Sequence, residues 1–261
     1  MRVEPLAEAA RMLPNQDPAP GAMASVPAPR MRTQCAICGV REACLACDLL
    51  PAPARAEFTG CGSRRVARGK HVYRAGDAFS ALFTVRSGSC KTCLPLPDGR
   101  EQVTGFQLSG DLLGLEAIGA GVHRCNAIAL EDSRVCVIEF AGLEAAALPL
   151  PELQRHLHKA MSLEIAREHA LMLVLGTMDA EERLASFLLG LSQRYADRGL
   201  PATPLHLHMK REEIGSHLGM KVETVSRALS RLRDEGLVRP ELRRLHLLDL
   251  AALSARVGAR G

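Results

Sequence analysis

The residue pattern changes at about position 150, and this change limits the possible folds more than any other feature. Between about 55 and 145, short runs of β-forming residues alternate with glycine-containing turns such as Ala75-Gly76-Asp77 and Pro97-Asp98-Gly99. Many short strands at regular spacing are typical of a barrel or a double-sheet roll. Beyond 150, apolar residues recur at helical spacing. We therefore expect an α+β fold in which an N-terminal β-roll precedes a helical part.

The helical part divides into one long helix and a smaller C-terminal module. Pro151 suits the first turn of the long helix. A seam of apolar residues runs along this helix: Leu157, Met161, Ile165, Met172 and Leu175. This seam can pack on the chain's own roll or pair with the same helix of a second copy, and the spacing favours neither. A shorter helix is expected over 180–196, a helix–turn–helix over 210–233 and a small β wing over 237–249.

These patterns predict four segments. Residues 1–34 form a proline-rich tail to which we assign no structure. A cysteine-rich segment and the β-roll sensor domain occupy 35–150, a dimerisation helix 151–180, and a winged helix-turn-helix DNA-binding domain 181–261. No apolar run approaches the roughly 18 residues that span a bilayer, and the N-terminus lacks a signal-peptide pattern. We therefore expect a cytoplasmic protein with no membrane partner.

The segment 210–233 has the pattern of a DNA-reading helix–turn–helix. Gly219 supplies the turn between two helices, and the second helix carries an apolar stripe of Val222, Val225, Leu229 and Leu232. Its opposite face presents Glu223, Ser226 and Arg227. Arginine pairs with guanine through two hydrogen bonds, glutamate accepts from cytosine, and serine adapts to either. We expect these three side chains to contact base edges in the major groove.

Four of the nine cysteines fall within thirteen residues, at Cys35, Cys38, Cys44 and Cys47. In a reducing compartment such clustering indicates metal or redox chemistry rather than disulfides. One interpretation is a four-thiolate zinc site built from these residues. The other is an iron–sulfur cluster held by three of them and one distant cysteine. The spacing by itself does not decide between the two.

The combination of motifs resembles the FNR subgroup of the CRP/FNR transcription regulators, over roughly residues 35–250. The resemblance includes the Cys-x2-Cys-x5-Cys opening and the recognition phrase Val222-Glu-Thr-Val-Ser-Arg227. It also includes roll phrases such as Arg74-Ala-Gly-Asp77, Val85-Arg-Ser-Gly88 and Gly110-Asp-Leu-Leu-Gly114. A cyclic-nucleotide-binding-like jelly roll and an oxygen-responsive [4Fe–4S] cluster are what this resemblance implies.

By the same resemblance, the cluster ligands are Cys35, Cys38, Cys44 and Cys136. From its mid-strand position alone, Cys136 would be interpreted as a small buried hydrophobe. Cys47 departs from the family pattern, and it can either replace a ligand or act as a nearby thiol. The resemblance further implies a homodimer that binds double-stranded DNA at a palindrome like TTGAT-N4-ATCAA, works with RNA polymerase and activates anaerobic genes.

Glu168 stands at seam spacing, three residues after Ile165 and four before Met172. If the helix pairs with itself across a two-fold axis, two Glu168 carboxylates meet in a low-dielectric seam and repel. This repulsion would favour the monomer when the cluster is absent, and the family places an acidic residue at this position. We therefore assign Ile165 and Glu168 to a dimer switch, with a solvent-facing Glu168 as the alternative.

Two other classes of function compete with this one. The alternative is a CRP-like regulator that responds to a cyclic nucleotide or another small ligand. Against a cyclic nucleotide, Leu115 replaces the expected glutamate and Cys125-Asn126 replaces the expected Arg-Ser, although Arg124 lies one position early. A redox enzyme using Cys90 and Cys93 is disfavoured because residues three apart on a strand point to opposite faces. The sequence shows neither a paired nucleophile and base nor a phosphate-binding loop, so we do not expect an enzyme.

Overall fold

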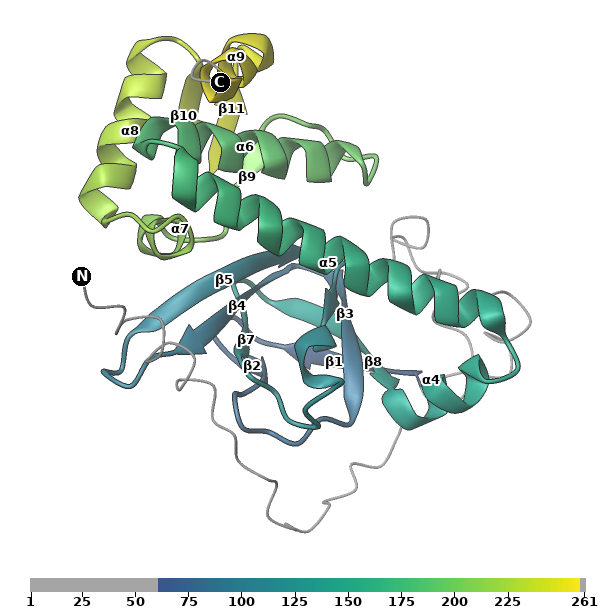
Figure 1. Ribbon diagram of the computed structural model, residues 1–261. Coiled ribbons are helices and arrows are strands. Elements are labelled where there is room, and N and C mark those ends of the chain that lie inside the picture. Colours follow the sequence, from purple (N-terminus) through teal and green to yellow (C-terminus); the bar gives the residue numbers. More distant parts are fainter. Residues whose placement is uncertain (1–60, 259–261) are drawn as a thin grey trace, which may run out of the picture.

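The computed structural model describes residues 61–258, which form a β-roll, a long helix and a helical C-terminal module (Figure 1). One antiparallel sheet has the order β1 (Cys61–Val66), β8 (Ser133–Glu139), β3 (Ala81–Ser87) and β6 (Leu112–Leu113). The other has the order β2 (His71–Tyr73), β7 (Asn126–Ala129), β4 (Ser89–Pro95) and β5 (Glu101–Leu108). A short 3-10 helix, η2 (Leu115–Ala117), follows β6. The predicted roll is confirmed.

The two sheets enclose an apolar core, and the expected glycine turns shape its ends. Val85 and Val135 pair across β3 and β8, and both are fully buried in this core. Gly88 joins β3 to β4 with a φ of +85°, and a Cβ atom there would lie 2.3 Å from the hydroxyl oxygen of Ser133. Only glycine therefore fits this turn without displacing β8.

The long helix packs on the roll through its first half. Helix α4 (Phe140–Ala147) leads into α5 (Pro151–Thr177), with Pro151 in its first turn as expected. In the first half of α5, Leu153 and Ala160 are buried on the roll, in one cluster with Leu82 and Ile138. The second half exposes Ile165, Met172 and Leu173. The helix therefore packs on its own roll at one end and leaves apolar residues uncovered in this single chain at the other.

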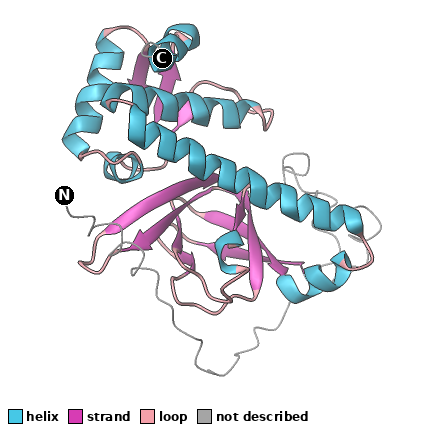
Figure 2. Cartoon of the chain, viewed as in Figure 1, coloured by secondary structure: helices cyan, strands magenta, loops and turns pink. Residues whose placement is uncertain are grey.

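The C-terminal module contains the predicted helix–turn–helix and wing (Figure 2). Its elements are α6 (Ala180–Ala196), β9 (Leu205–His206), α7 (Arg211–His217), α8 (Val222–Asp234), β10 (Val238–Glu241), β11 (Arg244–Leu247) and α9 (Leu250–Gly258). Asp179 and Glu182 form a capping box that begins α6. Among the described residues, no helix is long and apolar enough to cross a membrane.

The module sits against the roll through an apolar cluster that both parts share. This cluster includes Val103 and Phe106 of β5 together with Leu184 and Leu188 of α6. The Phe106 ring also lies 5.2 Å from the ring of His217, the last residue of α7. The placement of α7 and α8 is thus set partly by contacts with the roll.

Candidate DNA interface and cysteine site

Helix α8 has one buried and one exposed face, as its sequence predicts. Val225 and Leu232 are fully buried, while Val222 and Leu229 are partly buried. The preceding turn contains Gly219 with a φ of +62°, a conformation that side-chain-bearing residues rarely adopt. The exposed face of α8 is therefore set by the packing of the opposite face, and it is available for a groove of DNA.

The three predicted base-contacting residues lie in the first turns of α8. Glu223 and Arg227 are exposed, and Ser226 is partly exposed. The Ser226 hydroxyl accepts a 3.3 Å hydrogen bond from Arg211 of α7, and Arg227 donates a 3.4 Å hydrogen bond to Thr224. The exposed ends of these side chains offer donors and acceptors that suit base edges.

Two arginines farther along α8 are paired with carboxylates of the protein. Arg231 forms an ion pair with Glu181 of α6, and Arg233 pairs with its neighbour Asp234 at 2.8 Å. Glu181 also forms an ion pair with Arg256 of α9, at 2.6 Å. The two ion pairs of Glu181 tie α8 and α9 to α6, so the three helices hold the exposed face of α8 in one orientation.

Cys136 lies in the middle of β8, opposite Ser63 of β1 and Thr84 of β3. Because side chains alternate along a strand, Cys136 shares a face with Ile138, which packs against the beginning of α5. Its side chain is partly exposed, unlike those of Cys90, Cys93 and Cys125, which are buried. The prediction of a buried residue from strand position is therefore wrong for Cys136, because it faces away from the roll interior.

The remaining predicted ligands, Cys35, Cys38 and Cys44, lie outside the described residues, as does Cys47. Within residues 61–258, no three histidine, cysteine or acidic side chains gather as metal ligands. A metal site that includes Cys136 would therefore need ligands from outside these residues.

The Cys90–Cys93 pair has no redox geometry. Both side chains are fully buried, and they belong to different apolar clusters on opposite faces of β4. Burial raises the pKa of each thiol to about 12. Because the thiolate is the reactive form, both residues are inert core groups at neutral pH.

The positions expected to hold a nucleotide are engaged within the roll. Cys125 donates to Glu116 at 3.5 Å, and burial raises the pKa of its thiol. Asn126 accepts a 2.9 Å hydrogen bond from the backbone of Ala75. Nearby, the rings of Tyr73 and His123 stack with centroids 3.7 Å apart. A cyclic phosphate needs a cation or converging N–H donors, which Cys125 and Asn126 do not supply here.

The two predicted switch residues lie on the uncovered half of α5. Ile165 is 52% exposed and Met172 is 60% exposed, and Glu168 lies between them on the same helix face. An acidic side chain thus stands within an uncovered apolar face, as the seam spacing predicts. Whether this face pairs with a second copy stays a prediction.

Comparisons with known proteins agree with this architecture. The family described as cyclic nucleotide-binding domain matches residues 63–147, and the Crp-like helix-turn-helix domain matches 182–256. The transcriptional regulatory protein btr of Bordetella pertussis is 45% identical over 194 residues, covering 74% of this chain and 80% of that protein. The fumarate and nitrate reduction regulatory protein of Salmonella typhimurium is 39% identical over 193 residues, covering 74% and 77%.

A solved structure is similar over the same region. FixK2 from Bradyrhizobium japonicum superposes with a TM-score of 0.69 at 32% sequence identity, covering 74% of this chain and 96% of that one. The superposition therefore extends over nearly the whole of that chain.

Proposed function

The chain belongs to the FNR subgroup of the CRP/FNR family of transcription regulators, and from this premise we propose that it senses oxygen through a labile [4Fe–4S] cluster. It carries a DNA-binding helix-turn-helix, and its relatives are transcription regulators rather than enzymes. The cluster would control dimerisation and binding to a palindrome like TTGAT-N4-ATCAA, and RNA polymerase would be the partner at the promoter.

The observation that carries the proposal is the position of Cys136. Its partly exposed side chain lies on the sheet face that also packs against the beginning of α5. Cys44 precedes β1 by seventeen residues, a length of chain that reaches at most about 56 Å. Because β1 is the neighbour of β8, this length is ample for Cys35, Cys38 and Cys44 to join Cys136 around one cluster.

The donor set fits an iron–sulfur group. Cysteine thiolates are its usual ligands, and the group would supply iron–sulfur bonds that oxygen breaks. The chain's own contribution is to place one ligand on a strand of the roll and the other three on the N-terminal segment. Because Cys136 and the beginning of α5 share one face of the sheet, a ligand bound there is close to the helix that we assign to dimerisation.

The visible spectrum of full-length protein purified without air tests the proposal. We expect a broad absorption toward the blue and about four iron atoms per chain, with tight binding to the palindrome. Exposure to air should remove both the colour and the tight binding. A colourless zinc protein with unchanged DNA binding contradicts the proposal, and cAMP-dependent DNA binding by iron-free protein supports the alternative regulator.

Replacing Glu168 by alanine is expected to increase the dimer population of the air-exposed protein. The change removes two carboxylates that would otherwise meet across the helix pair, where burying like charges costs several kcal/mol. Sedimentation velocity of the aerobic protein measures the effect. Glu152→Ala is the control, because Glu152 is an exposed carboxylate at the beginning of α5, beside Arg155. An unchanged monomer fraction in Glu168→Ala would remove Glu168 from the switch.

A further inference from the structure

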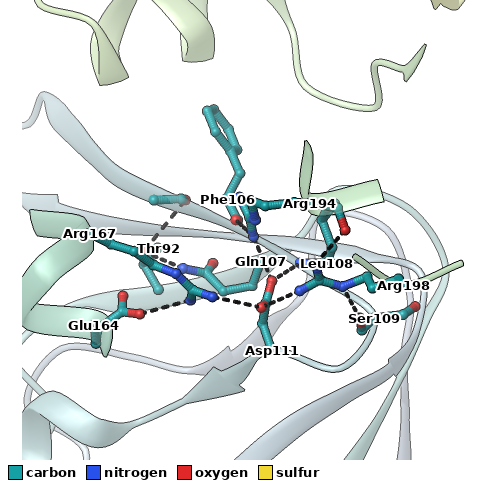
Figure 3. Close-up of polar contacts among 11 residues, drawn as sticks. Thr92, Phe106, Gln107, Leu108, Ser109, Asp111, Glu164, Arg167, Arg194 and Arg198 are labelled. Atoms are coloured by element: carbon teal, nitrogen blue, oxygen red, sulfur yellow. Dashed lines mark hydrogen bonds and ion pairs between the residues drawn. The ribbon is translucent and has the colours of Figure 1, made fainter. Parts of the chain in front are cut away.

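Asp111 is a buried carboxylate in the turn between β5 and β6, and it faces the helical module. It is only 1% exposed, so its charge requires partners. One oxygen accepts from the backbone of Leu108 at 2.7 Å and from Arg194 of α6 at 2.5 Å. The other accepts from Arg198, in the turn that follows α6, also at 2.5 Å (Figure 3). A roll residue thus binds two arginines of the DNA-binding module.

The same arginines bind the roll backbone around Asp111. Arg194 donates to the carbonyl oxygen of Phe106, and Arg198 donates to that of Ser109, both at 2.7 Å. Hydrogen bonds with a charged donor or acceptor are stronger than neutral ones, and partly buried ion pairs are screened less by salt. The C-terminal end of α6 is therefore held at one defined point on the roll.

Helix α5 reaches the same carboxylate. Arg167 lies 3.7 Å from Asp111 and is itself paired with Glu164 at 3.1 Å. Arg167 of α5 and Arg194 of α6 thus face one residue of the roll (Figure 3).

The junction itself is anchored by a different arginine. Helix α5 ends at Thr177 and α6 begins at Ala180. Arg183 donates to the carbonyl oxygens of Leu175 at 2.7 Å and Leu218 at 3.1 Å, which holds the beginning of α6. Arg194 stands eleven residues farther along α6, or about 17 Å at the rise of an α-helix.

A helix that is anchored at one end can change its angle to its neighbours, whereas anchors at both ends define that angle. Arg183 holds the near end of α6, and Asp111 holds the far end through Arg194 and Arg198. Helix α8 packs against α6 in the apolar cluster and is also tied to it by the Arg231–Glu181 ion pair, so we expect the two helices to move together. The angle of α6 against α5 consequently sets the place of the recognition face relative to the dimer helix.

We propose that Asp111 is a positioning residue for DNA binding, which sets the distance and rotation between the two recognition helices of a dimer. The inference rests on the proposed homodimer. Half-site spacing is a geometric property of a dimer that binds a palindrome. A looser Asp111 contact should therefore reduce the preference for one spacer length more than it reduces attraction to DNA in general.

The test compares Asp111→Asn with the unchanged full-length protein, both purified without air. Binding is measured by fluorescence anisotropy on the palindrome, on palindromes with the spacer lengthened or shortened by two base pairs, and on random DNA. Two base pairs rotate one half-site by about 70° against the other. The unchanged protein should strongly prefer the original spacer, and the variant should lose about tenfold of that preference, with random-DNA binding unchanged.

Asp98→Asn is the matched control, because Asp98 is an exposed roll aspartate that pairs with its neighbour Arg100. It should keep the full spacer preference. If Asp111→Asn does not fold, the double variant Arg194→Gln, Arg198→Gln makes the same measurement from the helix side. An unchanged preference, or an equal loss on every DNA, overturns the role of Asp111. An unchanged protein without any spacer preference overturns the proposed dimeric binding as well.

Discussion

Replacing Cys136 by serine is expected to abolish the oxygen-labile cluster. A serine hydroxyl does not replace a thiolate ligand, and a cluster with an incomplete ligand set is lost. Iron in protein purified without air should fall from about four atoms per chain to nearly none, and the visible absorption and tight palindrome binding should disappear with it. Because Cys136 is partly exposed, the substitution leaves no buried cavity, and the thermal unfolding of the iron-free protein should not change.

Cys47→Ser and Cys125→Ser are the controls for this experiment. Cys47 is the fourth cysteine of the N-terminal group, and Cys125 is a buried roll thiol hydrogen-bonded to Glu116. Both variants should retain the iron and the spectrum. The reverse result for Cys47 and Cys136 would indicate a local site formed by Cys35, Cys38, Cys44 and Cys47, and would refute the ligand set proposed above.

Replacing Arg227 by alanine should cost most of the sequence-specific binding. A good two-bond contact from arginine to a base is worth about 1–3 kcal/mol of discrimination, or roughly 5- to 150-fold in affinity. Arg227 is exposed in the first turns of α8, where such contacts are made. Binding to the palindrome and to random DNA, measured at one fixed salt concentration, separates this effect from general attraction to phosphates.

Arg231→Ala is the matched control for Arg227→Ala. Both are arginines on α8, but Arg231 is paired with Glu181 of the protein. It should lose much less discrimination, and Glu181 keeps its contact with Arg256. An equal loss on the palindrome and on random DNA in Arg227→Ala would identify Arg227 as a phosphate contact rather than a base contact.

Much of the fold was predictable because its signals are local. The turn at Ser87-Gly88 requires a positive φ, which only glycine adopts readily, so the end of β3 can be located from the residue type. The helix–turn–helix was predictable for a similar reason: the period that buries Val225 and Leu232 also places Arg227 on the exposed face. The spacing of apolar residues and the residue types at turns depend on a few neighbouring residues, so both can be recognised in the sequence.

In strand β8, the sequence pattern alone did not predict which face is buried. Its residues alternate between two faces, but which face is interior depends on the sheet that covers it. Strand position suggested a buried Cys136, whereas pairing with β1 and β3 places its side chain on the outer, partly exposed face. Helix α5 is similar, since one apolar seam is divided between a half packed on the roll and an uncovered half.

By itself, the sequence determined the element types, the glycine turns, the reading face of α8 and the family resemblance, because each depends on neighbouring residues or on a short motif. Only the tertiary structure decided which charges meet. Asp111 lies 83 residues from Arg194 and 87 from Arg198, and in the sequence it is simply part of a turn. No period relates such distant residues; they meet because packing of the roll against α6 excludes water around a carboxylate that then requires these arginines.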